Sequence, residues 1–272
     1  KNRFKGVVLG LSGGIDSALA VAIAVDALGA DRVRGIRMPS KYSSEGSLSD
    51  AKESAKLLNI KIDTINIEEI NKSYLGHLND LFKDLDKDTT EENIQSRIRG
   101  VILMAVSNKF GEMLISTGNK SEISVGYTTI YGDMNGGFCA LKDAYKTDVY
   151  NLSKWRNNHY NDLFLGPSGM AIPANSITKE PSAELDFNQK DQDSLPDYEV
   201  LDEILIKIIE EEASLDSIIS MGHDSELVHR VYRLLLLSEY KRRQSAPGVK
   251  LTARSFGKER RYPIVNAFLD DT

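Results

Sequence analysis

The sequence contains almost no cysteine, with one residue, Cys139, in a chain of 272. A single cysteine excludes an intrachain disulfide and any zinc site built from several thiolates, and it is typical of a reducing compartment. Glycine, phenylalanine, alanine and leucine surround Cys139 and no histidine lies near it, which favours a packing role over that of an activated nucleophile. We therefore expect a cytoplasmic protein without cysteine chemistry.

Long apolar runs are also missing, since none approaches the roughly 20 residues of a membrane helix. Basic residues before the first apolar stretch resemble the start of an export signal, but the segment Gly13-Gly14-Ile15-Asp16 interrupts that stretch. The sequence thus predicts neither a membrane span nor export. It starts at Lys1 without methionine, which leaves open that it is a fragment or a trimmed product.

Positive charge is in deficit, with 34 basic and 40 acidic residues and a net charge of −6. This balance argues against a nucleic-acid partner, which usually requires a basic surface. Basic side chains gathered in one cleft would still suit a small anionic substrate. The length and the 41% hydrophobic content are sufficient for a single globular domain over residues 1–272.

The most informative stretch is residues 9–17, Leu-Gly-Leu-Ser-Gly-Gly-Ile-Asp-Ser, between an apolar run and an alanine-rich segment. This order predicts a strand, a tight turn and a helix. The adjacent Gly13 and Gly14 let the backbone approach a ligand closely. Ser12 and Ser17 add hydroxyl groups beside a helix N-terminus, where free amides favour an anion. We expect a phosphate-binding loop here.

Two common phosphate loops do not match this stretch. The P-loop requires a lysine that is missing, and the dinucleotide fingerprint requires glycine two places after Gly10, where Ser12 stands. The pattern Ser-Gly-Gly-x-Asp-Ser instead resembles the pyrophosphate loop of ATP pyrophosphatases, in which Asp16 would hold Mg²⁺. The alternative is a structural turn in which Asp16 and Ser17 cap the helix.

Hydrophobic periodicity predicts alternating strands and helices along most of the chain. The predicted strands are residues 6–11, 32–38, 61–67 and 112–117, and the predicted helices are 17–28, 47–58, 70–85, 91–110 and 147–157. This alternation indicates an α/β fold with a doubly wound parallel sheet flanked by helices. Residues 118–144 are predicted as a site-forming loop, and the acidic residues 176–196 as a lid or a disordered excursion. Helices over 197–213 and 225–243 would form a C-terminal helical extension.

Further motifs make the resemblance specific. Asn93-Ile94-Gln95-Ser96-Arg97-Ile98-Arg99 begins a predicted helix, and taken alone its two arginines would be solvated surface residues. Ser-Thr-Gly-Asn-Lys-Ser-Glu follows at residues 116–122, then Gly126-Tyr127 and Tyr131-Gly132-Asp133. Together with the phosphate loop, and on to Lys241-Arg242-Arg243, these segments resemble the synthetase domain of NAD synthetases. Those ligases amidate nicotinic acid adenine dinucleotide (deamido-NAD) with ATP and ammonia.

The resemblance implies an adenine-nucleotide hydrolase-like fold, an acyl-adenylate intermediate, and release of AMP and pyrophosphate. It implies catalytic roles for Asp16, Glu122 and Lys146, with the two carboxylates as Mg²⁺ ligands. The ATP contacts that it implies are Gly10, Ser12, Gly13, Gly14, Asp16, Ser17, Arg99, Thr117, Lys146 and Ser182. The deamido-NAD contacts that it implies are Asn93, Arg97, Asp133, Lys179 and Lys241. Lys179 and Ser182 match the family's lid loop. Individually these residues have simpler readings, such as a surface lysine, a turn aspartate or a helix N-terminal acid.

The nitrogen source and the assembly stay open at this point. Residues 38–45 and the pair Tyr240-Lys241 look more like the glutamine-using branch, so ammonia is either free or supplied by a glutaminase domain preceding Lys1. The apolar residues 101–106 are compatible with a homodimer or a higher homo-oligomer. The rival functions are a GMP synthetase-like ligase, a tRNA-thiolating enzyme and a non-catalytic nucleotide-binding module.

Overall fold

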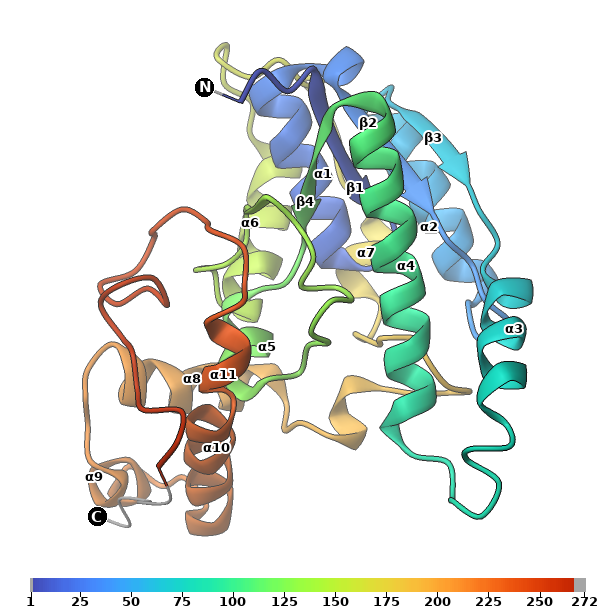
Figure 1. Ribbon diagram of the computed structural model, residues 1–272. Helices are drawn as coiled ribbons and strands as arrows, with labels where there is room; N and C mark the ends of the chain where they lie inside the picture. Colours follow the sequence, from blue (N-terminus) through green and yellow to red (C-terminus); the bar gives the residue numbers. More distant parts are fainter. Residues whose placement is uncertain (1, 267–272) are drawn as a thin grey trace.

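The computed structural model describes residues 2–266 and is built on a five-stranded parallel sheet between two layers of helices (Figure 1). The strands lie in the order β3 (Lys61–Thr64), β2 (Val33–Arg37), β1 (Gly6–Gly10), β4 (Glu112–Ser116) and β5 (Phe138–Cys139). The chain winds outward from β1 in one direction and then from β4 in the other. The predicted doubly wound sheet is therefore confirmed.

The central strand β1 pairs on both sides, with Val7 opposite Val33 of β2 and opposite Met113 of β4. Val8 and Leu9 are fully buried on opposite faces, as expected for a parallel strand covered by helices on both sides. Because β1 lies at the centre, the turn that follows it opens at the middle of the sheet edge.

Three helices cover one face of the sheet and two cover the other. The first face carries α1 (Ile15–Leu28), α2 (Glu45–Leu57) and α6 (Lys146–Asn158), and the second carries α3 (Glu68–Leu78) and α4 (Thr89–Phe110). The small, buried alanines of α1 allow its close approach to the sheet. Helix α4 begins with a capping box between Asp88 and Glu91, two residues before the predicted start. The helix predicted over 70–85 ends earlier, at Leu78.

The predicted C-terminal helical extension is confirmed as a second apolar core at one end of the molecule (Figure 1). Its helices are α8 (Tyr198–Ile209), α9 (Leu215–Ser220), α10 (Ser225–Leu237) and α11 (Glu239–Arg242). Helices α8, α10 and α11 pack around the short helix α5 (Lys120–Val125), and α9 packs against α8 and α10. Since α5 follows directly after β4, the extension contacts the sheet at its carboxyl edge.

The prediction that residues 118–144 form one loop is wrong, because this segment contains both α5 and β5. Asn119 and Glu122 form a capping box that starts α5, and Gly126 ends it in the left-handed conformation with φ of 73°. The segment predicted as a lid or disordered excursion, residues 176–196, includes most of α7 (Ala174–Thr178) and the 3₁₀ turn η2 (Asp191–Asp193); a further turn, η1, spans Ala30–Arg32.

Within residues 2–266, no helix combines the length and the apolar character that crossing a membrane requires.

Candidate functional site

The main cavity lies where the strand order reverses, between the carboxyl ends of β1 and β4, and has a volume of about 480 Å³. Open α/β sheets bind their ligands at this kind of switch point. The volume falls in the range of small-molecule sites. The walls come from the turn after β1, the start of α4, the α5 region and residues 179–185 of the predicted lid.

The turn after β1 is preformed by its own serines. The Ser17 hydroxyl donates to the carbonyl of Gly14 at 3.0 Å, and the Gly14 amide donates to the Ser12 hydroxyl at 3.1 Å. Gly13 has φ of 88°, and a Cβ there would collide with the carbonyl of Ser47 in α2. Gly13 therefore shapes the turn without lining the cavity, whereas Ser12, Gly14 and Ser17 line it.

Lys146 joins two carboxylates at the cavity wall. Its Nζ lies 2.6 Å from Oδ2 of Asp16 and 3.2 Å from Oε1 of Glu122. The three side chains come from the first turns of α6, α1 and α5. Asn119 completes the arrangement, because its amide group donates to the other oxygen of Asp16 at 2.8 Å. One buried ammonium thus holds three elements together at the centre of the site.

Burial and charge act in opposite directions on this cluster. Burial opposes the charge of Lys146, but attraction to Asp16 and Glu122 outweighs it and raises the pKa of the ammonium. Burial raises the pKa of Glu122 above its ordinary value, against the opposing pull of Lys146 and with a further contribution from Asp16. One lysine thus faces two carboxyl groups, and a cation bound beside them would favour the ionised form of Glu122.

The structure brings most of the predicted site residues to this cavity. Those lining it are Gly10, Ser12, Gly14, Asp16, Ser17, Asn93, Arg99, Thr117, Glu122, Asp133, Lys146, Lys179, Ser182 and Lys241. Arg97 does not line it; its side chain is exposed and donates to the carbonyl of Ile130. Arg99 donates to the carbonyl of Met38, and burial lowers its pKa to about 10, so it stays charged at neutral pH.

The predicted dinucleotide contacts organise the loop after α5. Thr129 donates its amide to Asp133 at 2.7 Å and its hydroxyl to Asn93 at 2.9 Å. The Lys241 ammonium donates to the carbonyls of Gly126 and Thr128. These bonds fix the loop between α4 and α11, which defines the side of the cavity opposite the phosphate loop.

The predicted lid touches both walls of the cavity. Glu184 accepts hydrogen bonds from Ser44 and Ser47 at the start of α2 and forms an ion pair with Lys179. On the other side, Gln95 of α4 donates to the carbonyl of Leu185 at 2.9 Å. The lid therefore bridges the two helices that flank the cavity entrance.

Two residues of the site, Asn119 and Asp191, were not predicted from the sequence. Asn119 orients Asp16, and the spacing of its capping box with Glu122 is the signal that would have indicated it. Asp191, from the lid, is 4% exposed, lines the cavity and accepts a hydrogen bond from Tyr198 at 2.8 Å. Burial raises the pKa of Asp191. No local pattern distinguishes it from the other acidic residues of that segment.

Cys139 is buried in β5, where its thiol contacts the carbonyl of Gly118, and burial raises the pKa of the thiol. This environment agrees with the predicted packing role, because an unreactive thiol is the expected state of such a cysteine.

Comparison with known proteins identifies the family. The family model described as NAD synthase matches residues 1–245. The chain belongs to the NAD synthase family. A glutamine-dependent NAD(+) synthetase of Rhodobacter capsulatus is 54% identical over 272 residues, which is all of this chain and 49% of that protein. The chain thus spans about half the length of the curated relatives that it matches.

Solved structures of an NAD+ synthetase and an NMN synthetase share the fold. A glutamine-dependent NAD+ synthetase from Acinetobacter baumannii, in complex with ADP, is 48% identical with a TM-score of 0.62, covering 97% of this chain and 46% of that one. An NMN synthetase from Francisella tularensis is 26% identical with a TM-score of 0.71, covering 88% and 87%. These neighbours agree with the adenine-nucleotide hydrolase-like fold that the sequence predicts.

Proposed function

We propose that the chain catalyses the ATP-dependent amidation of deamido-NAD to NAD, with release of AMP and pyrophosphate. The observation that carries this proposal is the Asp16–Lys146–Glu122 cluster beside a preformed phosphate loop at the sheet's switch point. Membership of the NAD synthase family supports it.

Amidation requires an activated carboxylate. An oxygen of the deamido-NAD carboxylate attacks the α phosphorus of ATP, and the bond to the bridging oxygen breaks so that pyrophosphate leaves with that electron pair. The nitrogen of ammonia then attacks the carbonyl carbon, AMP leaves and a proton is released. Neither step needs a side-chain nucleophile, so positioning and charge neutralisation dominate.

The cavity residues suit these two tasks. Ser12, Ser17 and the first amides of α1 offer donors for the leaving pyrophosphate. Lys146 and Arg99 supply positive charge for the phosphates. We assign Thr117 and Ser182 to ATP as well. On the opposite side, the deamido-NAD contacts would be Asn93, Asp133, Lys179, Lys241 and, from outside the cavity lining, Arg97.

The donor set at the centre of the site fits Mg²⁺. Asp16 and Glu122 offer hard carboxylate oxygens, and Mg²⁺ is commonly held by one or two carboxylates together with waters and substrate phosphates. No group of three or more acidic, histidine or cysteine side chains within residues 2–266 forms a metal site. When bound, Mg²⁺ would neutralise charge on the phosphates.

A product assay tests the proposal. The chain is incubated with ATP, Mg²⁺, deamido-NAD and ammonium, and the products are separated by chromatography. We expect AMP, pyrophosphate and NAD in equal amounts, and no AMP without the dinucleotide. Cys139→Ser is the matched control and should retain this activity. ADP and phosphate as products would overturn the proposal.

The assay also separates the alternatives. Nicotinic acid mononucleotide in place of the dinucleotide tests for the smaller acceptor suggested by the NMN synthetase neighbour. A GMP synthetase-like ligase or a tRNA-thiolating enzyme would release AMP only with its own acceptor. A non-catalytic nucleotide-binding module would release no AMP. We propose ammonium as a sufficient nitrogen source, with glutamine unable to replace it for these 272 residues, and a glutaminase domain as the natural partner.

Assembly is a separate proposal. Val101 is 62% exposed and Met104 is 38% exposed on α4, which is compatible with a homodimer paired through this helix.

A further inference from the structure

We infer that a C-terminal strap, residues 246–256, positions Lys146 and Glu122. It does so through a cluster around Lys120, called the clamp, that consists of Lys120, Asp143, Glu210 and Thr252. The inference rests on the proposed function, because it assigns positioning residues for that same site. It extends beyond the part of the chain that the family model matches, which ends at residue 245. Lys120 and Thr252 are the positioning residues, and neither lines the cavity.

The strap extends the sheet at its edge. Gly248 forms a parallel bridge with Cys139 of β5, and the Cys139 amide donates to the carbonyl of Pro247 at 2.8 Å. Lys142 donates to the carbonyl of Ala246 at 2.7 Å. The strap therefore runs beside β5 and reaches the back of α5, on the far side of that helix from the catalytic cavity.

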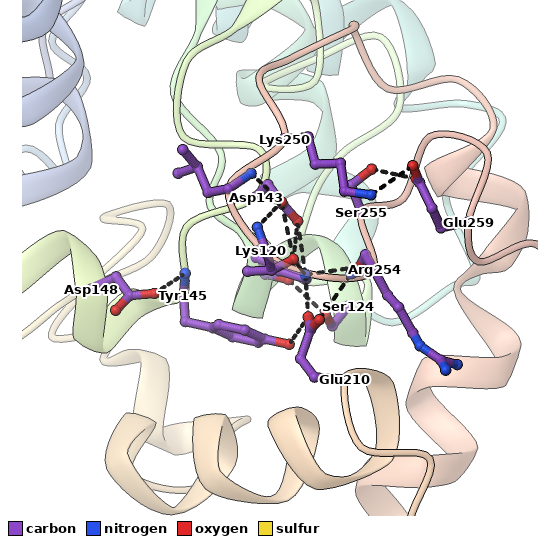
Figure 2. Close-up of polar contacts among 12 residues, drawn as sticks. Lys120, Ser124, Asp143, Tyr145, Asp148, Glu210, Lys250, Arg254, Ser255 and Glu259 are labelled. Atoms are coloured by element: carbon purple, nitrogen blue, oxygen red, sulfur yellow. Dashed lines mark hydrogen bonds and ion pairs between the residues drawn. The ribbon is translucent and has the colours of Figure 1, made fainter.

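At that point the strap closes over Lys120, whose side chain is completely buried. Figure 2 shows the side chain of Lys120 beside Asp143 and Glu210. The Lys120 ammonium lies 2.7 Å from Asp143 and 2.6 Å from Glu210, and it donates to the Thr252 hydroxyl at 2.6 Å. A further bond goes to the carbonyl of Arg254. Three segments distant from α5 in the sequence thus share one ammonium.

The strap also donates hydrogen bonds to the two carboxylates of the clamp. Asp143 accepts the amides of Leu251 and Thr252 and the Thr252 hydroxyl. Glu210, at the end of α8, accepts the Arg254 amide at 2.9 Å. Burial opposes the ionised form of Asp143, but its hydrogen bonds from Lys120 and the strap outweigh this and lower its pKa. The carboxylates of the clamp therefore have all of these hydrogen bonds only while the strap is in place.

The clamp is connected directly to the catalytic groups. Lys120 lies between Asn119, which orients Asp16, and Glu122, and its amide donates to the carbonyl of Ala144 at 2.7 Å. The next residue, Ser121, accepts a hydrogen bond through its hydroxyl from the backbone amide of Lys146 at 2.8 Å.

The residues after Asp143 complete this connection. Tyr145, directly before Lys146, donates its hydroxyl to Glu210 at 3.2 Å. The spacing between Lys146 and Glu122 thus depends on two backbone segments that the strap holds in register. A shift of either segment would displace the ammonium from the phosphates, which matters most in the transition state.

The Thr252 hydroxyl allows a specific test, because Thr252→Val removes it while keeping the shape and the amide bond to Asp143. Thr252→Ser restores the hydroxyl and is the matched control. For the valine variant we expect kcat for AMP release to fall about tenfold with little change in the KM for ATP, as for other residues that support a metal or phosphate site indirectly. The serine variant should stay within about twofold of the parent.

Hydrogen exchange of the ligand-free chain gives a readout that does not depend on activity. In Thr252→Val we expect the amides of α5 to exchange faster, while those of α1 keep the rate of the parent. A merely stabilising strap would instead lower the unfolding midpoint and leave both kcat of the folded protein and the α5 exchange unchanged. That result would overturn the inference.

The two proposals fail in different ways. A parent chain that releases no AMP from ATP and deamido-NAD overturns the proposed function, and the inference with it. A parent chain that is active, with a valine variant of equal kcat and equal α5 exchange, overturns only the positioning role of the strap.

Discussion

Two lysines of this chain make nearly the same ion pairs on opposite sides of α5. Lys146 lies 2.6 and 3.2 Å from its two carboxylates, and Lys120 lies 2.7 and 2.6 Å from its own pair. Both lysines are almost completely buried. The difference lies in what surrounds the acids: Asp16 and Glu122 line a cavity, whereas the strap and α8 cover Asp143 and Glu210.

This difference separates two uses of the same interaction. Around Lys120, backbone amides and a hydroxyl complete the hydrogen bonding of the two carboxylates, so neither depends on the ammonium alone. Around Lys146, burial raises the pKa of Glu122, so the ligand-free fold disfavours the ionised form of this carboxyl. A sealed, covered cluster whose carboxylates have all their hydrogen bonds is suited to structure, and an open cluster that lines a cavity with a raised carboxyl pKa is suited to binding charged substrates.

The largest expected effect is the loss of stability on Lys120→Met. Removing the ammonium leaves the buried Asp143 and the largely covered Glu210 without their common partner, and breaking a buried pair typically costs about 3–5 kcal/mol. Urea denaturation should show this loss as a lower free energy of unfolding. Lys250→Met is the control, because its pair with Glu259 is half exposed and should contribute less than about 1 kcal/mol. Equal losses in both variants would contradict the structural role of the sealed cluster.

Lys146→Met should lower activity more than stability, the opposite of what we expect for Lys120→Met. We expect turnover to fall about 10²–10³-fold, the usual cost of losing a preorganised electrostatic contact in a catalytic site. The loss of stability should be smaller than for Lys120→Met, because Asp16 and Glu122 can gain solvent from the cavity. Steady-state AMP release and urea denaturation of the same preparation measure both quantities. A variant that unfolds as readily as Lys120→Met would remove the distinction between the two clusters.

The sequence predicts the open cluster around Lys146 much better than the sealed cluster around Lys120. The phosphate loop at residues 9–17 is a local pattern whose glycines, serines and acid have direct physical reasons to stand together. Glu122 and Lys146 followed from resemblance to a family, and the fold brings both to Asp16 at the expected edge of the sheet. Alternating apolar periodicity was enough to predict the doubly wound sheet.

The sealed cluster depends on contacts that no local pattern contains. Lys120 and Thr252 are 132 positions apart, and the polar sequence around Lys120 reads as loop rather than as buried helix. Short helices such as α5 have too few apolar positions for a periodic signal, so the capping box is their only local signature. Asp191 was missed for a related reason, since its burial results from packing against Tyr198.

The smallest expected effect concerns pH, and the two clusters should respond with opposite signs. The folded-state pKa of Glu122 is raised, so this group stabilises the fold below its unfolded value near 4.5, and that contribution is lost as pH rises toward the folded value. The folded-state pKa of Asp143 is lowered, so it stabilises the fold above its unfolded value near 3.8 and loses this contribution as pH falls through the folded value.

Glu122→Gln should therefore stabilise the ligand-free chain at pH 7–8, by about 1.4 kcal/mol for each unit by which the folded-state pKa is raised. The gain should shrink to nothing near pH 4.5, where the parent's carboxyl is already protonated. Asp143→Asn should instead destabilise at pH 7 and flatten the loss of stability below pH 4. Urea denaturation across this pH range without Mg²⁺ or nucleotide measures both curves. A loss of stability at neutral pH in Glu122→Gln would mean that attraction to Lys146 outweighs burial there. The ionised carboxylates around Lys146 would then be as well stabilised as those around Lys120.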